Sequence, residues 1–199
     1  MDTMPKLLLA TSNRGKVREY RELLRGVPFE LVTPDELGIS LDVEEAGDTF
    51  EANAALKAMA AARLTGLLSL ADDSGLEVDD LGGAPGPQSA RYAGPHASDK
   101  DRIAFLLSRL KDIPARERSA RFRCVIAIAS PGGKVELFSG VCSGILADAP
   151  RGTQGFGYDP IFFIPELGKT MAELTLEEKN KVSHRARAAM KAREYLKTL

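Results

Sequence analysis

The chain has 199 residues, of which 44% are hydrophobic and 28% are charged, and its formal net charge is −1. This composition is ordinary for a globular protein, and the balanced charge gives no basis for non-specific binding to nucleic acid or to a membrane surface. No stretch approaches the roughly 18 apolar residues of a membrane span, and the N-terminus lacks the basic leader of a signal peptide. We therefore expect one domain over residues 1–199, located in the cytoplasm, that binds neither membrane nor nucleic acid.

The first half of the chain is predicted to alternate between strands and helices. Short apolar runs predict buried strands, and apolar residues that recur every three to four positions predict helices. Asp48 stands three residues before Glu51, as in a capping box, and starts one of these helices. In chain order we expect a strand at 6–10, a helix at 15–24, a strand at 29–32, a helix at 48–64, a strand at 67–71, an acidic turn and a strand at 75–79.

The second half begins with a loop rich in glycine and proline, at residues 82–97, and a helix at 99–110. Two strand-like stretches, 119–130 and 134–146, flank the turn sequence PGG and predict a long hairpin. A final helix starts at a capping box of Thr175 and Glu178 and is expected to reach the C-terminus. Helix-flanked strands and a hairpin together predict an α/β protein with a mixed, twisted β-sheet and flanking helices.

Two cysteines, Cys124 and Cys142, lie in the apolar stretches of this predicted hairpin. So small a number in strand-like sequence indicates reduced thiols rather than a disulfide framework. The two residues could also face one another across a sheet, so a bridge between them is an open alternative.

A polar segment follows the first predicted strand and opens the first helix. Thr11, Ser12 and Asn13 offer short hydroxyl and amide side chains, and Gly15 and Lys16 begin the helix. Free amides at a helix N-terminus together with an ammonium group are a common way to bind phosphate. The spacing is not that of a Walker loop. The segment predicts a phosphate site, and the alternative is an ordinary helix N-cap beside a solvated lysine.

A lysine lies within the apolar stripe of the helix predicted at 48–64. Phe50, Ala54 and Lys57 follow helical spacing, and Asn53 comes one turn before the lysine. Such a lysine either extends to the surface along its apolar stem or meets an anion in a cleft. The sequence alone leaves both interpretations open.

Five acidic residues crowd into the stretch ADDSGLEVDD, residues 71–80. Repulsion and desolvation disfavour such a cluster unless cations lie among its members. Asp72 and Asp73 follow a buried strand directly, and Glu44 and Glu45 form another acidic pair upstream. Carboxylates without clustered histidine or cysteine favour Mg²⁺ over zinc, and a carboxylate beside such a metal can accept a proton from water. The stretch predicts a metal and proton-transfer site, with a solvated acidic turn as the alternative.

Two C-terminal segments are suited to a flat ligand. In GTQGFGYDPIFF, Phe156 lies between glycines and could stack on a base while Asp159 reads its edge, although a simple turn beside a sheet is the alternative. In EEKNKVSHRARAAMKAR, the front of a helix carries Lys179, His184 and Arg185, although a basic helix face is usually just solvated. A nucleoside triphosphate would explain all of these features together.

Five blocks of the sequence, in this order, resemble the inosine/xanthosine triphosphate pyrophosphatase family: ATSNRGKVREY, DTFEANAALKA, ADDSGLEVDDLGGAPGPQSARYAG, GFGYDPIFF and EEKNKVSHR. They extend from Ala10 to Arg185, which is nearly the whole chain. The resemblance implies an elongated α/β subunit of two lobes with a central substrate cleft, which forms a homodimer. It also implies Mg²⁺-dependent hydrolysis of ITP, dITP and XTP to the monophosphate and pyrophosphate, which removes them from the nucleotide pool.

The resemblance further implies roles for individual residues. Asp73 is the expected proton acceptor and metal ligand, Glu44 is a second expected metal ligand, and Asp72 is an additional candidate; whether Glu44 or Glu45 faces the metal is open. The residues expected to bind substrate are Thr11, Ser12, Asn13, Arg14, Gly15, Lys16, Lys57, Ser74, Phe156, Gly157, Tyr158, Asp159, Lys179, His184 and Arg185. Residues 11–16 and Lys57 would bind phosphates, residues 156–159 the nucleoside, and the last three the base. The segment reads T-S-N where many members read T-G-N, a departure that bears on phosphate geometry.

Two other functions are compatible with parts of this pattern. A septum-related, Maf-like nucleotide pyrophosphatase would share the general architecture, but the GFGYDPIFF and SHR blocks count against it. A non-catalytic nucleotide sensor would retain the pocket, but intact Asp73, Lys16 and Lys57 count against a loss of catalysis. Release of pyrophosphate from ITP in the presence of Mg²⁺ would separate the three.

Overall fold

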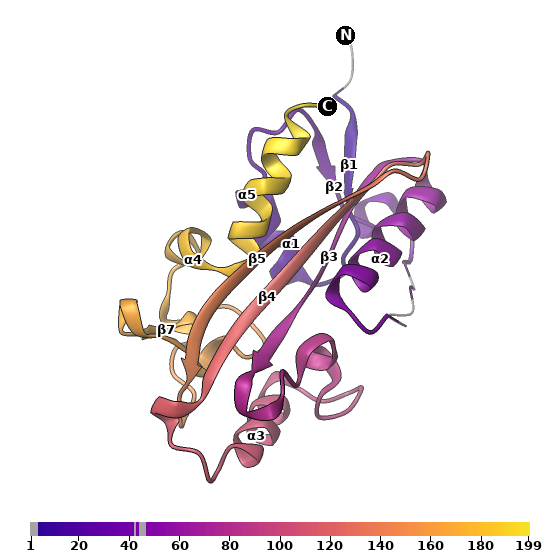
Figure 1. Ribbon diagram of the computed structural model, residues 1–199. Helices are drawn as coiled ribbons and strands as arrows, with labels where there is room; N and C mark the ends of the chain where they lie inside the picture. Colours follow the sequence, from indigo (N-terminus) through magenta and orange to yellow (C-terminus); the bar gives the residue numbers. More distant parts are fainter. Residues whose placement is uncertain (1–3, 42, 44–46) are drawn as a thin grey trace. The chain divides into compact units, whose positions relative to one another are not determined.

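The computed structural model describes residues 4–41, 43 and 47–199 (Figure 1). The chain divides into two compact units. Unit 1 comprises Met1–Asp73, Cys124–Gly140 and Arg185–Leu199, and unit 2 comprises Ser74–Arg123 and Val141–His184. Strands β3, β4 and β5, whose bounds follow, each contribute residues to both units.

Within the described residues, seven strands form one sheet in the order β2-β1-β3-β4-β5-β6-β7. Strand β1 pairs in parallel with β2 and β3, whereas the β5–β6 and β6–β7 pairs are antiparallel. The predicted mixed α/β fold is therefore confirmed. The strands are β1 Lys6–Leu9, β2 Glu30–Val32, β3 Leu68–Val78, β4 Ser119–Ala129, β5 Val135–Leu146, β6 Phe162–Ile164 and β7 Lys169–Thr170. The helices are α1 Arg14–Leu23, α2 Phe50–Thr65, α3 Asp99–Arg109, α4 Leu176–Val182 and α5 His184–Leu196.

Most of the acidic stretch lies within a strand, which corrects the prediction of an acidic turn between two strands. Strand β3 runs without a break from Leu68 to Val78 and includes both Asp72 and Asp73, whereas Asp79 and Asp80 follow its end. Successive side chains of a strand point to opposite faces of the sheet. Asp72 therefore shares a face with Leu70, and Asp73 shares the other face with Ala71.

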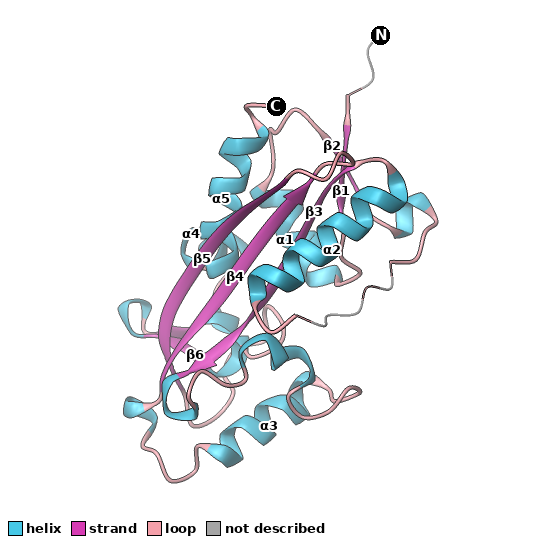
Figure 2. Ribbon diagram, turned by 45° about the vertical axis from the view of Figure 1, so that its right-hand side comes forward, coloured by secondary structure: helices cyan, strands magenta, loops and turns pink. Residues whose placement is uncertain are grey.

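Different helices cover the two faces of the sheet in unit 1, with α1 and α5 on one face and α2 on the other (Figure 2). On one face, Leu70 and Cys124 pack with side chains of α1 and α5, among them Tyr20. On the other face, Ala71 packs with the alanines of α2, and the residues of β4 in this cluster are small as well. The members of this second cluster include Ala54, Ala58, Ala61, Ala62, Ala71, Val125, Ala127 and Ala129.

The observed helix ends agree in part with those predicted from the sequence. The capping box of Thr175 and Glu178 starts α4 as predicted, because the Thr175 side chain accepts from the Glu178 backbone. Helix α2 begins one residue later than Asp48 would place it: Thr49 is its N-cap and accepts from the backbone of Ala52. The prediction of a single C-terminal helix was wrong, because Ser183 has an extended backbone and separates α4 from α5.

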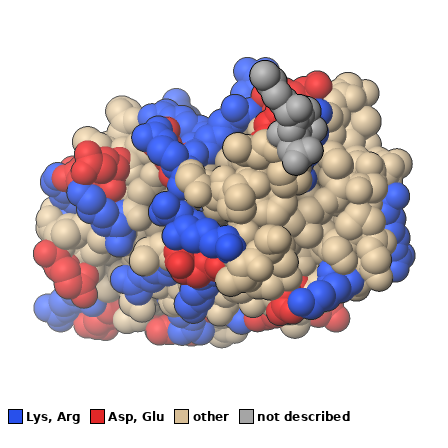
Figure 3. All heavy atoms as spheres, turned by 90° about the horizontal axis from the view of Figure 1, so that it is seen from above, with Lys and Arg blue, Asp and Glu red and all other residues tan. Residues whose placement is uncertain are grey.

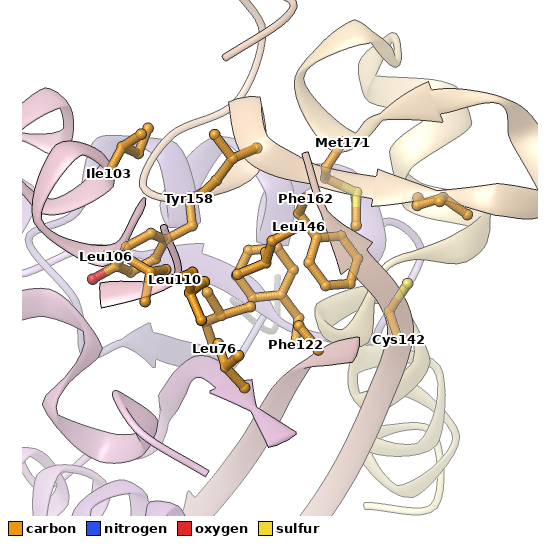
Figure 4. Close-up of a cluster of buried hydrophobic side chains, with 14 of the residues drawn as sticks. Leu76, Ile103, Leu106, Leu110, Phe122, Cys142, Leu146, Tyr158, Phe162 and Met171 are labelled. Atoms are coloured by element: carbon orange, nitrogen blue, oxygen red, sulfur yellow. The ribbon is translucent and has the colours of Figure 1, made fainter. Parts of the chain in front are cut away.

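Unit 2 has its own hydrophobic core (Figure 4). Phe162 of β6 is fully buried and its ring centroid lies 4.4 Å from that of Phe122 in β4. Gly144 of β5 makes room for this ring, since a Cβ there would lie 2.8 Å from the Phe162 ring. Strands β6 and β7 were not predicted, because runs of three and two residues are too short to show a period.

The predicted hairpin of β4 and β5 is confirmed, with the backbone N–H of Ser130 donating to the carbonyl of Lys134 across the turn. Cys124 and Cys142 are both buried free thiols in the structure. Burial and the nearby charge of Asp72 raise the pKa of Cys124 to about 12. A thiol with so high a pKa is a poor nucleophile at neutral pH.

The surface mixes charges of both signs. Lys and Arg side chains lie next to Asp and Glu side chains across the face shown in Figure 3. Exposed pairs of this kind include Lys181 with Glu177 and Arg25 with Glu22. In the part of the chain that the structure describes, no helix is both long and apolar enough to cross a membrane.

Replacement of Phe162 by alanine should lower the free energy of unfolding by about 3–5 kcal/mol, because it leaves a cavity beside Phe122. The control is Leu167→Ala, whose side chain is exposed and whose loss should change stability by about 0.5 kcal/mol or less. Urea denaturation followed by circular dichroism measures both. Equal losses in the two variants would contradict the assignment of Phe162 to the core of unit 2.

Candidate active site

The polar segment 11–16 connects β1 to α1 in unit 1. Asn13 is the N-cap of α1, and its Oδ1 accepts from the backbone N–H of Lys16 at 3.1 Å. The backbone N–H of Asn13 donates in turn to Oγ1 of Thr11 at 3.2 Å. The side chains of Ser12 and Arg14 are exposed. The segment therefore presents the N-terminus of a ten-residue helix, a favourable place for an anion, beside the ammonium group of Lys16.

Asp72 lies in a buried group of charges on the α1 and α5 face of the sheet. Nζ of Lys16 is 3.0 Å from its Oδ1, and Nη2 of Arg185 is 3.5 Å from its Oδ2. The thiol of Cys124 also lies 3.7 Å from Oδ2. Burial alone would raise the pKa of Asp72, but the charges of Lys16 and Arg185 outweigh burial and hold that pKa well below its usual range. Asp72 is therefore ionised at neutral pH.

Arg185, which was expected to read the base, belongs to this same buried group in unit 1. Its side chain is 2% exposed, and its Nη1 lies 2.7 Å from Oε2 of Glu19. Its guanidinium carbon is 5.9 Å from the ring centroid of Tyr20. Any contact of Arg185 with a base would have to be added to its ion pairs with Glu19 and Asp72.

Asp73 points to the opposite face, toward α2. Nδ2 of Asn53 donates to Oδ2 of Asp73 at 3.0 Å, and Nζ of Lys57 lies 3.6 Å from Oδ1. The side chains of Lys57 and Asp73 are 16% and 7% exposed. Of the two alternatives for Lys57, the structure thus favours a lysine that meets an anion over one that extends into solvent.

These contacts of unit 1 compensate charge on both faces of the sheet. Among the described residues, the contacts join three carboxylates and three cations, namely Glu19, Asp72, Asp73, Lys16, Lys57 and Arg185. Glu44 and Glu45 lie outside the described residues. The crowding of Asp72 and Asp73 is possible because each has cations on its own side of the strand.

Unit 2 brings together Phe156, Asp159 and Lys179. Nζ of Lys179 lies 2.6 Å from Oδ2 of Asp159 and 4.9 Å from the ring centroid of Phe156. The backbone N–H of Phe156 donates to the same carboxylate oxygen at 3.0 Å. A side chain at Gly155 would collide with this oxygen, so glycine is required there. The arrangement fixes an aromatic ring beside a buried ion pair.

The other residues of unit 2 that were expected to bind substrate lie in different surroundings from one another. Tyr158 is 4% exposed and is part of the hydrophobic core, where its hydroxyl donates to the carbonyl of Ser89 at 3.0 Å. The ring of His184 is also buried and stacks on Phe122, with 4.7 Å between centroids. Ser74 follows Asp73 in β3 and is partly buried. Gly157 donates its backbone N–H to Oδ2 of Asp99 at 2.7 Å.

Three residues with a place in these groups were not expected as functional residues: Glu19, Asn53 and Asp99. Asn53 had a weak signal, since it stands four residues before Lys57 on the same helix face. Glu19 and Asp99 contact partners far away in the chain, Arg185 and Gly157. No local pattern marks such a pair, so only the folded chain identifies them.

An α/β sheet that carries a helix N-terminus, lysines and buried carboxylates in one unit defines a class of protein suited to phosphate-bearing ligands. Comparison with known sequences is more specific. The model of the Ham1 family matches residues 7–195, and the chain belongs to this family.

Individual relatives agree over nearly the full length. A dITP/XTP pyrophosphatase of Geobacter sulfurreducens is 54% identical over 193 residues, which are 97% of each chain. The dITP/XTP pyrophosphatase of Bacillus subtilis is 46% identical over 98% of this chain and 99% of its own. The structure of a HAM1 protein from Coxiella burnetii superposes with a TM-score of 0.89 at 42% identity, covering 98% of this chain and all of that one.

Replacement of Arg185 by alanine should lower the free energy of unfolding by about 3–5 kcal/mol, because it leaves the carboxylates of Glu19 and Asp72 buried without their partner. The control is Arg187→Ala, which removes an exposed arginine from the same helix and should have little effect. Urea denaturation at neutral pH measures both variants. A variant without Arg185 that is as stable as the control would contradict the buried ion-pair group.

Proposed function

We propose that the chain hydrolyses the non-canonical purine nucleoside triphosphates ITP, dITP and XTP to the monophosphate and pyrophosphate. Support comes from membership of the Ham1 family and from relatives named dITP/XTP pyrophosphatase that cover 97% or more of this chain. The observation that carries the proposal is Asp73, a carboxylate within reach of both Asn53 and Lys57. Water would form a bond to the α-phosphorus while the bond from that phosphorus to the bridging oxygen breaks and pyrophosphate leaves.

Asp73 is the proposed proton acceptor for the attacking water. A carboxylate held by a lysine and an amide can accept a proton at a defined place. Lys16, Lys57 and the N-terminus of α1 would bind the phosphates, with the short side chains of residues 11–13 beside them. Fixed charges of this kind stabilise the charge that develops on the phosphate oxygens.

Mg²⁺ is the proposed cofactor. Within the described part of the chain, no three carboxylate, histidine or cysteine side chains form a metal site by themselves. A site with a single carboxylate from the protein fits Mg²⁺, because this ion is commonly bound through one or two carboxylates together with substrate phosphates. Asp73 would supply the carboxylate, while the expected ligand Asp72 keeps Lys16 and Arg185 as its partners. When bound, the metal would neutralise phosphate charge and lower the pKa of water.

Base recognition is proposed for the group in unit 2. The ring of Phe156 is suited to stack on a base, and Asp159 and Lys179 supply an acceptor and donors beside it. Lys179 and His184 can donate to the 6-oxo group that ITP and XTP share, and a 6-amino group would leave such donors unpaired. The resemblance adds Gly157, Tyr158 and Ser74 to the residues near substrate.

We also propose that the protein acts as a homodimer in the cytoplasm. The homodimer rests on the resemblance to the family. The location is supported by the two free thiols, which are typical of a reducing compartment. Sedimentation of the purified protein would test the dimer directly.

Asp73→Asn should abolish release of pyrophosphate from ITP, because the change removes the proton acceptor at nearly constant shape. The control is Asp80→Asn, which removes an exposed aspartate from the end of the same acidic stretch. Wild type and variants are compared with ITP, dITP, XTP and ATP at one Mg²⁺ concentration, and ¹⁸O from labelled water should appear in the monophosphate. Asp73→Asn activity within about tenfold of wild type, near 1.4 kcal/mol in the barrier, would remove this residue from the role of base. Tight binding of ITP by the wild type without turnover would instead indicate a nucleotide sensor.

Lys57→Met keeps the apolar stem of the side chain and deletes its charge. If Lys57 contacts a phosphate or holds Asp73, kcat/KM for ITP should fall by about thirtyfold or more, which corresponds to about 2 kcal/mol. Arg63→Met is the control, because Arg63 is an exposed cation on the same helix. An unchanged kcat/KM in Lys57→Met would show that the contact with Asp73 has no part in turnover.

A further inference from the structure

Asn53 lies, fully buried, between a backbone amide and the carboxylate of Asp73. Its Nδ2 donates to Oδ2 of Asp73 at 3.0 Å. Its Oδ1 accepts from the backbone N–H of Gly47 at 2.9 Å. The side chain thus connects Gly47, which precedes α2, to the acid in the middle of β3.

An amide is the side chain that both neighbours require. A carboxylate accepts hydrogen bonds, whereas a backbone N–H donates one, and the amide of asparagine offers one donor group and one acceptor. The two partners therefore also determine which way the amide is turned. Alanine at position 53 would remove the hydrogen bonds to the N–H of Gly47 and to Oδ2 of Asp73. The loss of a hydrogen bond is costly where its partner is buried.

Gly47 leaves the space that Asn53 needs. A Cβ at this position would lie 2.7 Å from Oδ1 of Asn53 and 2.9 Å from Cβ of Ala52. Both distances are shorter than a van der Waals contact, so alanine at position 47 would displace the Asn53 amide or the backbone next to it. The requirement for glycine is steric and comes from a residue six positions later in the chain.

Two donors of α2 hold the two oxygens of Asp73. Lys57 lies near Oδ1 and Asn53 donates to Oδ2, and these residues are one helical turn apart. Contacts to both oxygens restrict rotation of the carboxylate about its bond to Cβ. A carboxylate restricted in this way directs its lone pairs along fixed lines, which is what a proton acceptor requires.

We propose that Asn53 is a positioning residue for Asp73 and that Gly47 is required because it holds Asn53 in place. The inference rests on the proposed function, since it takes Asp73 to be the proton acceptor. It adds two residues to the site, which act through Asp73 and not on the substrate. It also explains why a buried asparagine is kept in a helix whose other buried side chains are almost all alanine.

The test compares Gly47→Ala, Asn53→Ala and the double variant with Gly132→Ala, all as purified full-length protein at saturating Mg²⁺. Gly132 lies in the β4–β5 turn, where a Cβ would have its nearest contact at an ordinary 3.8 Å, so this control should equal wild type. We expect kcat for ITP to fall about 100-fold in Asn53→Ala and about tenfold in Gly47→Ala, with KM changed less than twofold, because a displacement of about 1 Å can cost this much. The double variant should be no slower than Asn53→Ala, since the amide on which Gly47 acts is already absent.

A second readout does not involve turnover. Urea unfolding of wild type, the two single variants and the double variant, all without metal, gives a double-mutant cycle for positions 47 and 53. We expect the two losses of stability to be less than additive. Additive losses, or a kcat equal to that of the control in both single variants, would overturn the inference while wild type remains active. A rise in KM at constant kcat would also overturn it, because it would assign Asn53 to substrate binding. A wild type that releases no pyrophosphate from ITP would overturn the proposed function itself.

Discussion

Strand β3 carries two neighbouring carboxylates into the interior of unit 1, and the arrangement around them follows from the need to compensate each one. An uncompensated buried carboxylate costs several kcal/mol, and two side by side would also repel one another. The alternation of the strand separates them, with Asp72 toward α1 and α5 and Asp73 toward α2. Lys16 and Arg185 then serve one acid, and Lys57 and Asn53 serve the other.

The small side chains of α2 allow this compensation on the second face. Alanines of the helix pack against Ala71 and Ala127 of the sheet, so the helix backbone can approach the strands closely. Asparagine has a short side chain, and its amide reaches Asp73 only because of this approach. The alanine content of α2 therefore has a direct role in the site.

The sequence predicts much of this molecule, for reasons that are local. Apolar runs, helical spacing and a turn sequence mark β1, α1, α3 and the β4–β5 hairpin, because these elements depend on residues near in the chain. The continuity of β3 was missed, since two aspartates and Ser74-Gly75 are typical of a turn and only their distant partners make a strand possible there. The break at Ser183 was missed because no glycine or proline marks it in the sequence.

The candidate site, too, could be predicted from the sequence only where its residues carry a local signal. Lys57 and Asp73 were expected together, whereas the burial of Arg185 between Glu19 and Asp72 was not. That ion-pair group joins residues separated by more than a hundred positions in the chain. A basic residue at the front of a helix carries no sign, in the sequence, of whether it faces solvent or an acid of the core.

The alternation of β3 also restricts how the gene can change in length. Deletion of one codon ahead of Asp72 would turn every later residue of the strand to the opposite face. Asp72 would then meet the alanines of α2, and Asp73 would take the place beside Arg185. The proposed proton acceptor would then be on the wrong side of the sheet. Evolution can therefore alter this strand by substitution, whereas changes in length are confined to connections such as the β4–β5 turn.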